Sequence, residues 1–319
     1  MDYYVGIDLG GTNTKIGLLN IEGDILKSSI IKTLSSEGVD KTMERIWGVI
    51  QELAKEANIN IKNVKGIGMG IPGPVEDQSI VAFFANFPWG TNVNVKEKLE
   101  KITGIEAKLD NDANIIALGE AKYGAAKGSK SSVTVALGTG IGGGIYVNGR
   151  LVSGFKGAGG EIGHMKIVKD GRVCGCGQKG CFEAYASATG LIREAVSRLT
   201  VNKQNLLYTM IEGNIAGLEA KDIFDAAKEG DAFSLDLVDY EAEYLAMGIA
   251  NILNIINPET IVLGGGVALA GDILLDPLRK KLEKYALPVT LEDLKIVQGI
   301  LGNEAGIKRS SRAFFIKTR

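Results

Sequence analysis

Proline is scarce in this sequence, at six of 319 residues, and there is no run of about 18 consecutive apolar residues. With 45% hydrophobic and 23% charged residues, this composition argues against long disordered linkers, and we expect the chain to fold throughout. The first residues, MDYYVGIDLGG, have neither the basic start nor the apolar core of a signal peptide. These absences predict a cytoplasmic protein without a membrane-spanning helix.

Positive charge is not in excess either. Lys and Arg number 36 against 38 Asp and Glu, which gives a formal net charge of -2. A protein that neutralises a nucleic-acid backbone or an anionic membrane surface presents a basic excess. We therefore expect neither nucleic acid nor a membrane as a partner.

Histidine and cysteine are also rare, with one His and three Cys, and all four lie in one segment. They are His164, Cys174, Cys176 and Cys181. Three thiolates and one imidazole form a closed tetrahedral set for structural Zn²⁺, without an open position for catalysis. In a reducing cytoplasm, an odd number of closely spaced cysteines favours metal binding over disulfides, and a chance cluster of buried cysteines is the alternative.

The length and the alternation of helical and strand-like patterns predict two α/β domains. Strand-like Tyr3–Ile7 and Lys15–Leu19 flank a glycine turn, and a second strand and glycine turn of similar layout begin near Val133. Apolar residues at helical spacing run from 245 to 256 and stop at Asn257. The repeated hairpin layout suggests that the two domains share a plan.

Three glycine turns, DLGGTNTK, GTGIGGG and VLGGGV, each follow a strand-like segment. Glycine there lets backbone N–H groups approach an anion closely, so we expect the phosphates of a nucleotide at these turns. The residues concerned are Asp8, Gly10, Gly11, Thr12, Lys15, Gly138, Thr139, Gly140, Gly264, Gly265 and Gly266. Asp8 would hold Mg²⁺ through water. None of the turns matches the Walker pattern, and GTGIGG lacks the long helix expected directly after a dinucleotide fingerprint. For any single turn the alternative is glycine that only tightens a hairpin.

These motifs, in this order, resemble the two phosphate motifs and the adenosine motif of the sugar kinase, actin and Hsp70 superfamily. Within it, CGCGQKGCFEAYAS, residues 174–187, resembles the Cys-x-Cys-Gly-x-x-Gly-Cys-x-Glu-x-x-x-Ser signature of ROK kinases at every fixed position. The preceding GEIGH resembles the Gly-Glu-x-Gly-His segment of the same family. The resemblance runs from about residue 5 to beyond residue 306 and is closest to bacterial and archaeal glucokinases of the family.

The resemblance implies a two-lobed α/β fold of the actin-like ATPase (ribonuclease H-like) type, with an interlobe cleft and a small zinc-binding loop. We expect an N-terminal lobe at residues 1–110, joined by a C-terminal helix at about 305–319. The C-terminal lobe, residues 111–304, would carry the zinc loop and the adenosine motif. Because family members are commonly dimers or tetramers, we also expect a homo-oligomer.

The resemblance assigns Asp112 as the general base that accepts the proton of the 6-hydroxyl of a sugar. Asp110 is the rival base, and capping of the helix expected at Ala113–Tyr123 is the alternative role for either acid. The implied sugar contacts are Gly73, Asn86, Asn111, Asp112, Glu161, His164 and Glu183. Since Glu161 and Glu183 adjoin the metal ligands, the metal would organise the sugar site without performing chemistry. A double role of His164, toward zinc and sugar, is likewise implied by the resemblance.

The function implied is that of an ATP-dependent hexokinase that binds a small-molecule hexose and converts glucose to glucose 6-phosphate, with Mg²⁺. Kinases of the family for fructose, allose or N-acetylmannosamine are the nearest alternatives. A sugar-sensing repressor would carry an N-terminal helix-turn-helix, and GIDLGG at residue 6 leaves no room for one. An ATPase related to Hsp70 or actin would lack the cysteine segment. ADP or polyphosphate as phosphoryl donor stays open.

Overall fold

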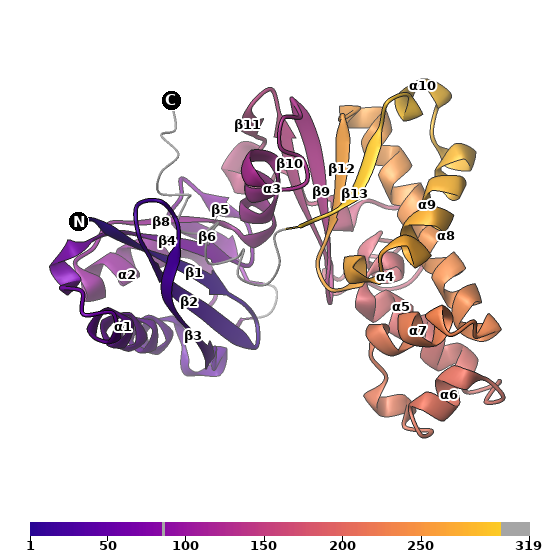
Figure 1. Ribbon diagram of the computed structural model, residues 1–319, viewed down its shortest axis with the longest axis horizontal. Helices are drawn as coiled ribbons and strands as arrows, with labels where there is room; N and C mark the ends of the chain where they lie inside the picture. Colours follow the sequence, from indigo (N-terminus) through magenta and orange to yellow (C-terminus); the bar gives the residue numbers. More distant parts are fainter. Residues whose placement is uncertain (85–86, 301–319) are drawn as a thin grey trace. The chain divides into compact units, whose positions relative to one another are not determined.

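The computed structural model describes residues 1–84 and 87–300. These residues form two compact units, Met1–Gly119 with Leu151–Gly160, and Glu120–Arg150 with Glu161–Ile300 (Figure 1). The first unit therefore extends past the expected boundary at residue 110 and takes in a further segment after the second unit has begun. Asn86 and the helix expected at about 305–319 lie outside the described residues.

The first unit is built on a five-stranded sheet in the order β3-β2-β1-β4-β8. Its strands are β1 (Tyr3–Leu9), β2 (Asn13–Leu19), β3 (Ile25–Lys32), β4 (Val64–Ile71) and β8 (Ala107–Asn111). β1 and β2 form the antiparallel hairpin that the sequence predicts, while β4 runs parallel to β1 and to β8. A separate three-stranded sheet consists of β5 (Val75–Glu76), β6 (Ile80–Phe83) and β7 (Thr91–Asn94).

Two α-helices, α1 (Val39–Glu56) and α2 (Val95–Thr103), pack on the first sheet. Met43, Ile46 and Ile50 recur at helical spacing on α1 and are fully buried. They share one hydrophobic core with the apolar residues of β1, β2 and β4. This core holds the β1–β2 hairpin, whose turn is the first glycine motif.

The second unit repeats this plan with a sheet in the order β11-β10-β9-β12-β13. Its strands are β9 (Ser131–Leu137), β10 (Ile141–Val147), β11 (Arg150–Leu151), β12 (Thr260–Gly264) and β13 (Lys295–Gln298). β9 and β10 are an antiparallel hairpin, and β12 runs parallel to β9 and to β13. A hairpin followed by two parallel strands thus occurs in both units, which confirms the common plan that the two similar glycine segments suggest.

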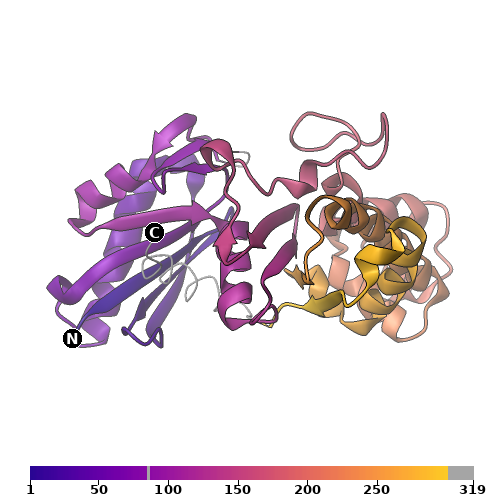
Figure 2. The same ribbon diagram turned by 90° about the horizontal axis from the view of Figure 1, so that it is seen from above.

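Helices cover one face of the second sheet (Figures 1 and 2). The remaining α-helices are α3 (Asp112–Tyr123), α4 (Glu183–Ala186), α5 (Ala188–Leu199), α6 (Leu206–Met210), α7 (Ala220–Lys228), α8 (Ala232–Ile256), α9 (Asp272–Tyr285) and α10 (Pro288–Leu291). The 3₁₀ helices are η1 (Ser35–Glu37), η2 (Ile61–Asn63), η3 (Phe155–Gly157), η4 (Ile162–His164), η5 (Ile215–Gly217) and η6 (Val267–Ala270).

The longest helix, α8, forms the centre of the second core. Leu245, Ile249 and Leu253 of α8 are fully buried. The helix ends where the sequence predicts, because Asn257 adopts a left-handed conformation with φ 46° and a proline follows. None of the helices in the described part of the chain combines the length and hydropathy that a bilayer span requires.

Candidate functional site

The candidate base Asp112 lies at the junction of β8 and α3, where the chain turns from strand to helix. Asn111 caps the helix, because its Oδ1 accepts hydrogen bonds from the N–H groups of Ala113 at 3.0 Å and Asn114 at 3.2 Å. Its Nδ2 donates to the carbonyl of Gly73 at 3.1 Å. Three of the predicted sugar contacts, Gly73, Asn111 and Asp112, are thus brought together in the first unit.

Gly73 occupies a position that requires glycine. Its φ is +107°, and a Cβ there would lie 2.4 Å from the carbonyl oxygen of Phe83. The loop after β4 therefore passes close to the backbone of β6. This close approach fixes the carbonyl that Asn111 binds.

Asp110, the rival base, is held by the same turn. Its Oδ1 accepts the N–H of Asn111 at 2.7 Å and the Nδ2 of Asn114 at 3.0 Å. The pKa of Asp110 is raised above its usual value because the side chain is buried, and these two hydrogen bonds offset only part of the rise. Asp112 is half-buried, and its Oδ1 accepts the N–H of Ala113 at 2.8 Å. The contacts of Asp110 therefore stabilise the turn between β8 and α3, which carries Asp112.

The first glycine turn lies between β1 and β2. Asp8 and Lys15 stand opposite each other in the hairpin register, with 3.7 Å between Lys15 Nζ and Asp8 Oδ2. A Cβ on Gly10 would lie 2.8 Å from the carbonyl oxygen of Asn13, whereas one on Gly11 would meet open space. Gly11 and Thr12 are exposed at the tip. The carboxylate, the cation and the hydroxyl predicted for phosphate and Mg²⁺ are therefore gathered at one end of the hairpin.

The second and third glycine turns lie side by side in the second unit. Gly265 has a φ of +83°, and a Cβ there would lie 2.3 Å from the carbonyl oxygen of Leu137. Gly138, Thr139 and Gly266 line one pocket of about 430 Å³, a volume within the range of small-molecule sites. The structure thus joins two of the three glycine motifs, the second phosphate motif and the adenosine motif, in one pocket.

Helix α7 supplies a further part of the pocket wall, which the sequence reasoning missed. Its lining residues include Lys221, Phe224, Asp225 and Lys228. Lys221 forms an ion pair with Asp225, and Lys228 Nζ lies 3.6 Å from the same carboxylate. The spacing of Lys221, Asp225 and Lys228 places them on one face of the helix. That charged stripe is the only signal in the sequence, and it is typical of any solvated helix.

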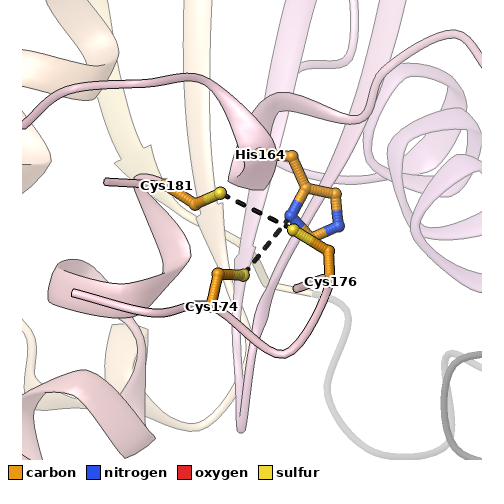
Figure 3. Close-up of side chains that lie close together, drawn as sticks. All are labelled: His164, Cys174, Cys176 and Cys181. Atoms are coloured by element: carbon orange, nitrogen blue, oxygen red, sulfur yellow. Dashed lines mark hydrogen bonds between the residues drawn. The ribbon is translucent and has the colours of Figure 1, made fainter. Parts of the chain in front are cut away.

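The predicted metal ligands converge in space (Figure 3). The ligand atoms of His164, Cys174, Cys176 and Cys181 all lie within 4.8 Å of one another. Cys174 Sγ is 3.7 Å from His164 Nδ1, and Cys176 Sγ is 3.7 Å from Cys181 Sγ. Ligands about 2.3 Å from a tetrahedral zinc ion lie roughly 3.7 Å apart, so these side chains fit the geometry of a zinc site.

One thiol of the cluster is affected by burial, and another contacts an ammonium group. Burial raises the pKa of the Cys174 thiol to about 12, and binding of a metal would displace its proton. Lys166 Nζ donates to Cys181 Sγ at 3.0 Å and to the carbonyl of His164 at 2.9 Å. The ammonium group of Lys166 therefore adjoins both ends of the proposed ligand set.

Two carboxylates adjoin this cluster. His164 Nε2 lies 3.9 Å from Glu161 Oε2. The pKa of Glu161 is raised above its usual value, and burial is the main cause. The nearby His164 offsets part of this rise, and the carboxylate of Glu183 adds to it. A Cβ on Gly163 would lie 2.2 Å from the carbonyl oxygen of Ile141, so this segment packs on the first residue of β10. The second unit therefore brings together the remaining predicted sugar contacts of the described chain, Glu161, His164 and Glu183.

Comparison with known proteins identifies the family of the chain. Residues 4–309 match the ROK family. The chain belongs to the ROK family. This ROK protein is 40% identical to a glucokinase of Halalkalibacterium halodurans over 307 residues, which are 96% of this chain and 92% of that protein. It is also 30% identical to a xylose repressor of Caldicellulosiruptor bescii, over 92% of this chain and 73% of the repressor.

A solved structure extends the likeness to the whole fold. The ROK family glucokinase from Streptomyces griseus, in complex with glucose and AMPPNP, is 32% identical and superposes with a TM-score of 0.83. The superposition covers 98% of each chain. The two-lobed α/β fold of the actin-like ATPase type that the sequence predicts is thereby confirmed.

Proposed function

We propose that this ROK protein is an ATP-dependent glucokinase, which transfers the γ-phosphoryl group of ATP to the 6-hydroxyl of glucose. The observation that carries the proposal is the gathering of Glu161, His164 and Glu183 at β10, the strand that begins after the glycine turn of the pocket. Carboxylates and an imidazole are suited to recognising sugar hydroxyls, and a glycine turn to binding phosphates. Similarity to two glucokinases supports the choice of glucose.

In this proposal Asp112 is the general base. Phosphoryl transfer to an alcohol depends mainly on in-line positioning and charge neutralisation, and a carboxylate within about 3 Å accepts the hydroxyl proton. Asn111 binds the sugar and also fixes the turn, through its contacts to Gly73 and the start of α3. Asn86, Gly73, Glu161, His164 and Glu183 complete the proposed sugar contacts.

The nucleotide would be bound by the glycine turns. Gly138, Thr139, Gly140, Gly264, Gly265 and Gly266 would bind phosphates and adenosine in the second unit, and Gly10, Gly11, Thr12 and Lys15 would add phosphate contacts from the first. Asp8 would hold Mg²⁺, which neutralises charge on the transferred phosphoryl group. The half-exposed carboxylate of Asp8 suits a water-mediated contact of this kind.

The cysteine cluster would hold Zn²⁺ in a structural role. The donor set is closed, with three sulfur atoms and one nitrogen atom, which leaves no position for substrate. The ion would stabilise the loop between His164 and Cys181 and so fix the proposed sugar-binding carboxylates on either side. A homo-oligomeric state and a cytoplasmic location stay predictions, and light scattering coupled to size exclusion measures the first.

The experiment that tests the proposed function identifies the product. The purified chain is incubated with glucose, Mg²⁺ and either ATP, ADP or polyphosphate, and the phosphorus NMR spectrum is recorded. The proposal predicts glucose 6-phosphate with ATP as the effective donor. Phosphorylation at another hydroxyl, or a strong preference for another donor, would overturn that part of the proposal, and the absence of any sugar phosphate would favour a sugar-binding regulator.

A further inference from the structure

The carboxylate of Glu183 contacts the glycine turn between β9 and β10 directly. Its Oε2 accepts a hydrogen bond from the backbone N–H of Ile141 at 2.9 Å. A Cβ on Gly140 would lie 2.2 Å from the same oxygen. Position 140 therefore requires glycine because the Glu183 carboxylate occupies the space that a side chain would need. This requirement is separate from the one expected from the sequence, which is close approach of the backbone to a phosphate.

The turn is tied to this part of the structure at more than one point. Within the turn, the N–H of Gly138 donates to the carbonyl of Gly140 at 3.0 Å. From outside, the N–H of Ala188, the first residue of α5, donates to the carbonyl of Gly138 at 2.9 Å. The residues 183–188 thus hold the turn at both ends, one end through a backbone bond and the other through the Glu183 carboxylate.

The backbone that carries Glu183 is held in place by the packing of the preceding residue. The preceding Phe182 is fully buried, and its N–H donates to the carbonyl of Met165 at 2.8 Å. A Cβ on Gly248 of α8 would lie 2.5 Å from the Phe182 ring, so the ring packs directly on the helix backbone. Cys181, a proposed metal ligand, precedes Phe182. The carboxylate is therefore placed by packing and by the metal loop, which allows it to restrain the turn.

We propose that Glu183 is a positioning residue for the nucleotide-phosphate turn, in addition to its proposed contact with the sugar. One oxygen fixes the N–H of Ile141 and thereby the path of Gly138–Gly140, while the other faces Cys174 Sγ at 3.4 Å. A single carboxylate then supports the binding of both substrates. This inference rests on the proposed function, because it requires the turn to bind a nucleotide.

The test measures nucleotide and sugar binding separately. AMPPNP with Mg²⁺ is titrated calorimetrically into the full chain without sugar, and glucose is titrated without nucleotide. Glu183→Ala removes the acceptor for Ile141, and we expect AMPPNP to bind about tenfold or more weakly. Glu183→Gln keeps a side-chain oxygen that accepts this bond, so AMPPNP binding should stay within about threefold of wild type while glucose binding weakens. Glu161→Gln is the matched control and should weaken glucose binding alone.

Unchanged AMPPNP binding in Glu183→Ala would overturn the inference. So would an equal loss in Glu183→Ala and Glu183→Gln, because that pattern indicates a general structural role of the ionised carboxylate. If wild type binds glucose but no AMPPNP, the proposed kinase function fails, and a weakening confined to glucose in both Glu183 variants would refute the positioning role alone.

A double-mutant cycle with Gly140→Ala checks the mechanism. In the wild-type background the new methyl group meets the Glu183 carboxylate, so we expect weaker AMPPNP binding. In the Glu183→Ala background the methyl group has room, and Gly140→Ala should add little further loss. Fully additive effects would mean that the two residues act independently and would contradict the proposed contact.

Discussion

The Nε2 atom of His164 lies 3.9 Å from Oε2 of Glu161, while Nδ1 of the same ring lies 3.7 Å from Cys174 Sγ. The two ring nitrogens therefore face different groups. If Nδ1 binds the metal, the proton stays on Nε2, the atom that faces Glu161. The proposed zinc site thus determines which hydrogen-bonding group His164 offers to a sugar.

Glu161 is expected to act on the sugar alone. Replacement by Gln removes the negative charge beside His164, and we predict that the Kd for glucose rises about tenfold, the amount expected for loss of one charge-assisted hydrogen bond. The Kd for AMPPNP should stay within about twofold. Calorimetry with each ligand measures both constants, and a larger effect on the nucleotide would show that Glu161 belongs to the nucleotide site.

The cysteine cluster predicts about one zinc ion per chain. Cys176→Ala should lose the ion and lower the melting temperature, because metal binding and folding of the loop are linked. Lys179→Ala replaces an exposed residue of the same loop, and this control variant should keep the zinc ion and the wild-type melting temperature. Elemental analysis of the purified variants measures the metal, and equal zinc content in Cys176→Ala and wild type would exclude Cys176 as a ligand.

Asp112 and Asp110 should respond differently to the same substitution. Asp112→Asn removes the proposed base and should lower kcat by roughly 10²-fold or more, with glucose affinity nearly unchanged. Asp110→Asn keeps an oxygen that accepts the hydrogen bonds from Asn111 and Asn114, so its kcat should fall far less. Steady-state kinetics of the two variants decides between them. The opposite ranking would make Asp110 the base.

Glu241 of α8 is fully buried, and its two carboxylate oxygens have no hydrogen-bond partner among the described residues. Burial raises its pKa well above 4.5, so the folded protein keeps the proton while the unfolded chain releases it. The Glu241 contribution to stability therefore falls as pH rises from about 4.5 toward the folded-state pKa, by at most about 1.4 kcal/mol per pH unit.

Glu241→Met has a similar length and no charge, so we expect a gain of about 1–3 kcal/mol at pH 8 and a smaller gain at pH 5. Urea unfolding at both pH values measures the free energy of unfolding of each protein. A loss of stability at pH 8, or equal effects at the two pH values, would show that Glu241 has a polar partner in solution.

The parts of the site that the sequence predicts are those whose residues are close in the chain. The glycine turns follow their strands directly, and the proposed metal ligands Cys174, Cys176 and Cys181 share one short loop, so local patterns are sufficient to predict both features. The end of α8 at Asn257 was predictable for the same reason, because the helical spacing and its stop signal are adjacent.

The parts that sequence reasoning missed depend on contacts between distant segments. Lys221 and Asp225 of α7 line the pocket beside Gly138, although nothing in their helix distinguishes them from surface charges. The bond from Ile141 to Glu183 joins residues 42 positions apart, and no pattern in either segment indicates it. These contacts arise only when the chain folds and brings the distant segments together.

Sugar-dependent ADP release from ATP tests the proposed glucokinase activity most directly, measured with glucose, fructose, mannose, allose and N-acetylmannosamine and without sugar. We predict that kcat/KM for glucose exceeds that for every other sugar by about tenfold or more, the discrimination expected when buried polar groups are left unpaired by the wrong sugar. ADP release that does not depend on sugar, or a higher kcat/KM for another hexose, would contradict it.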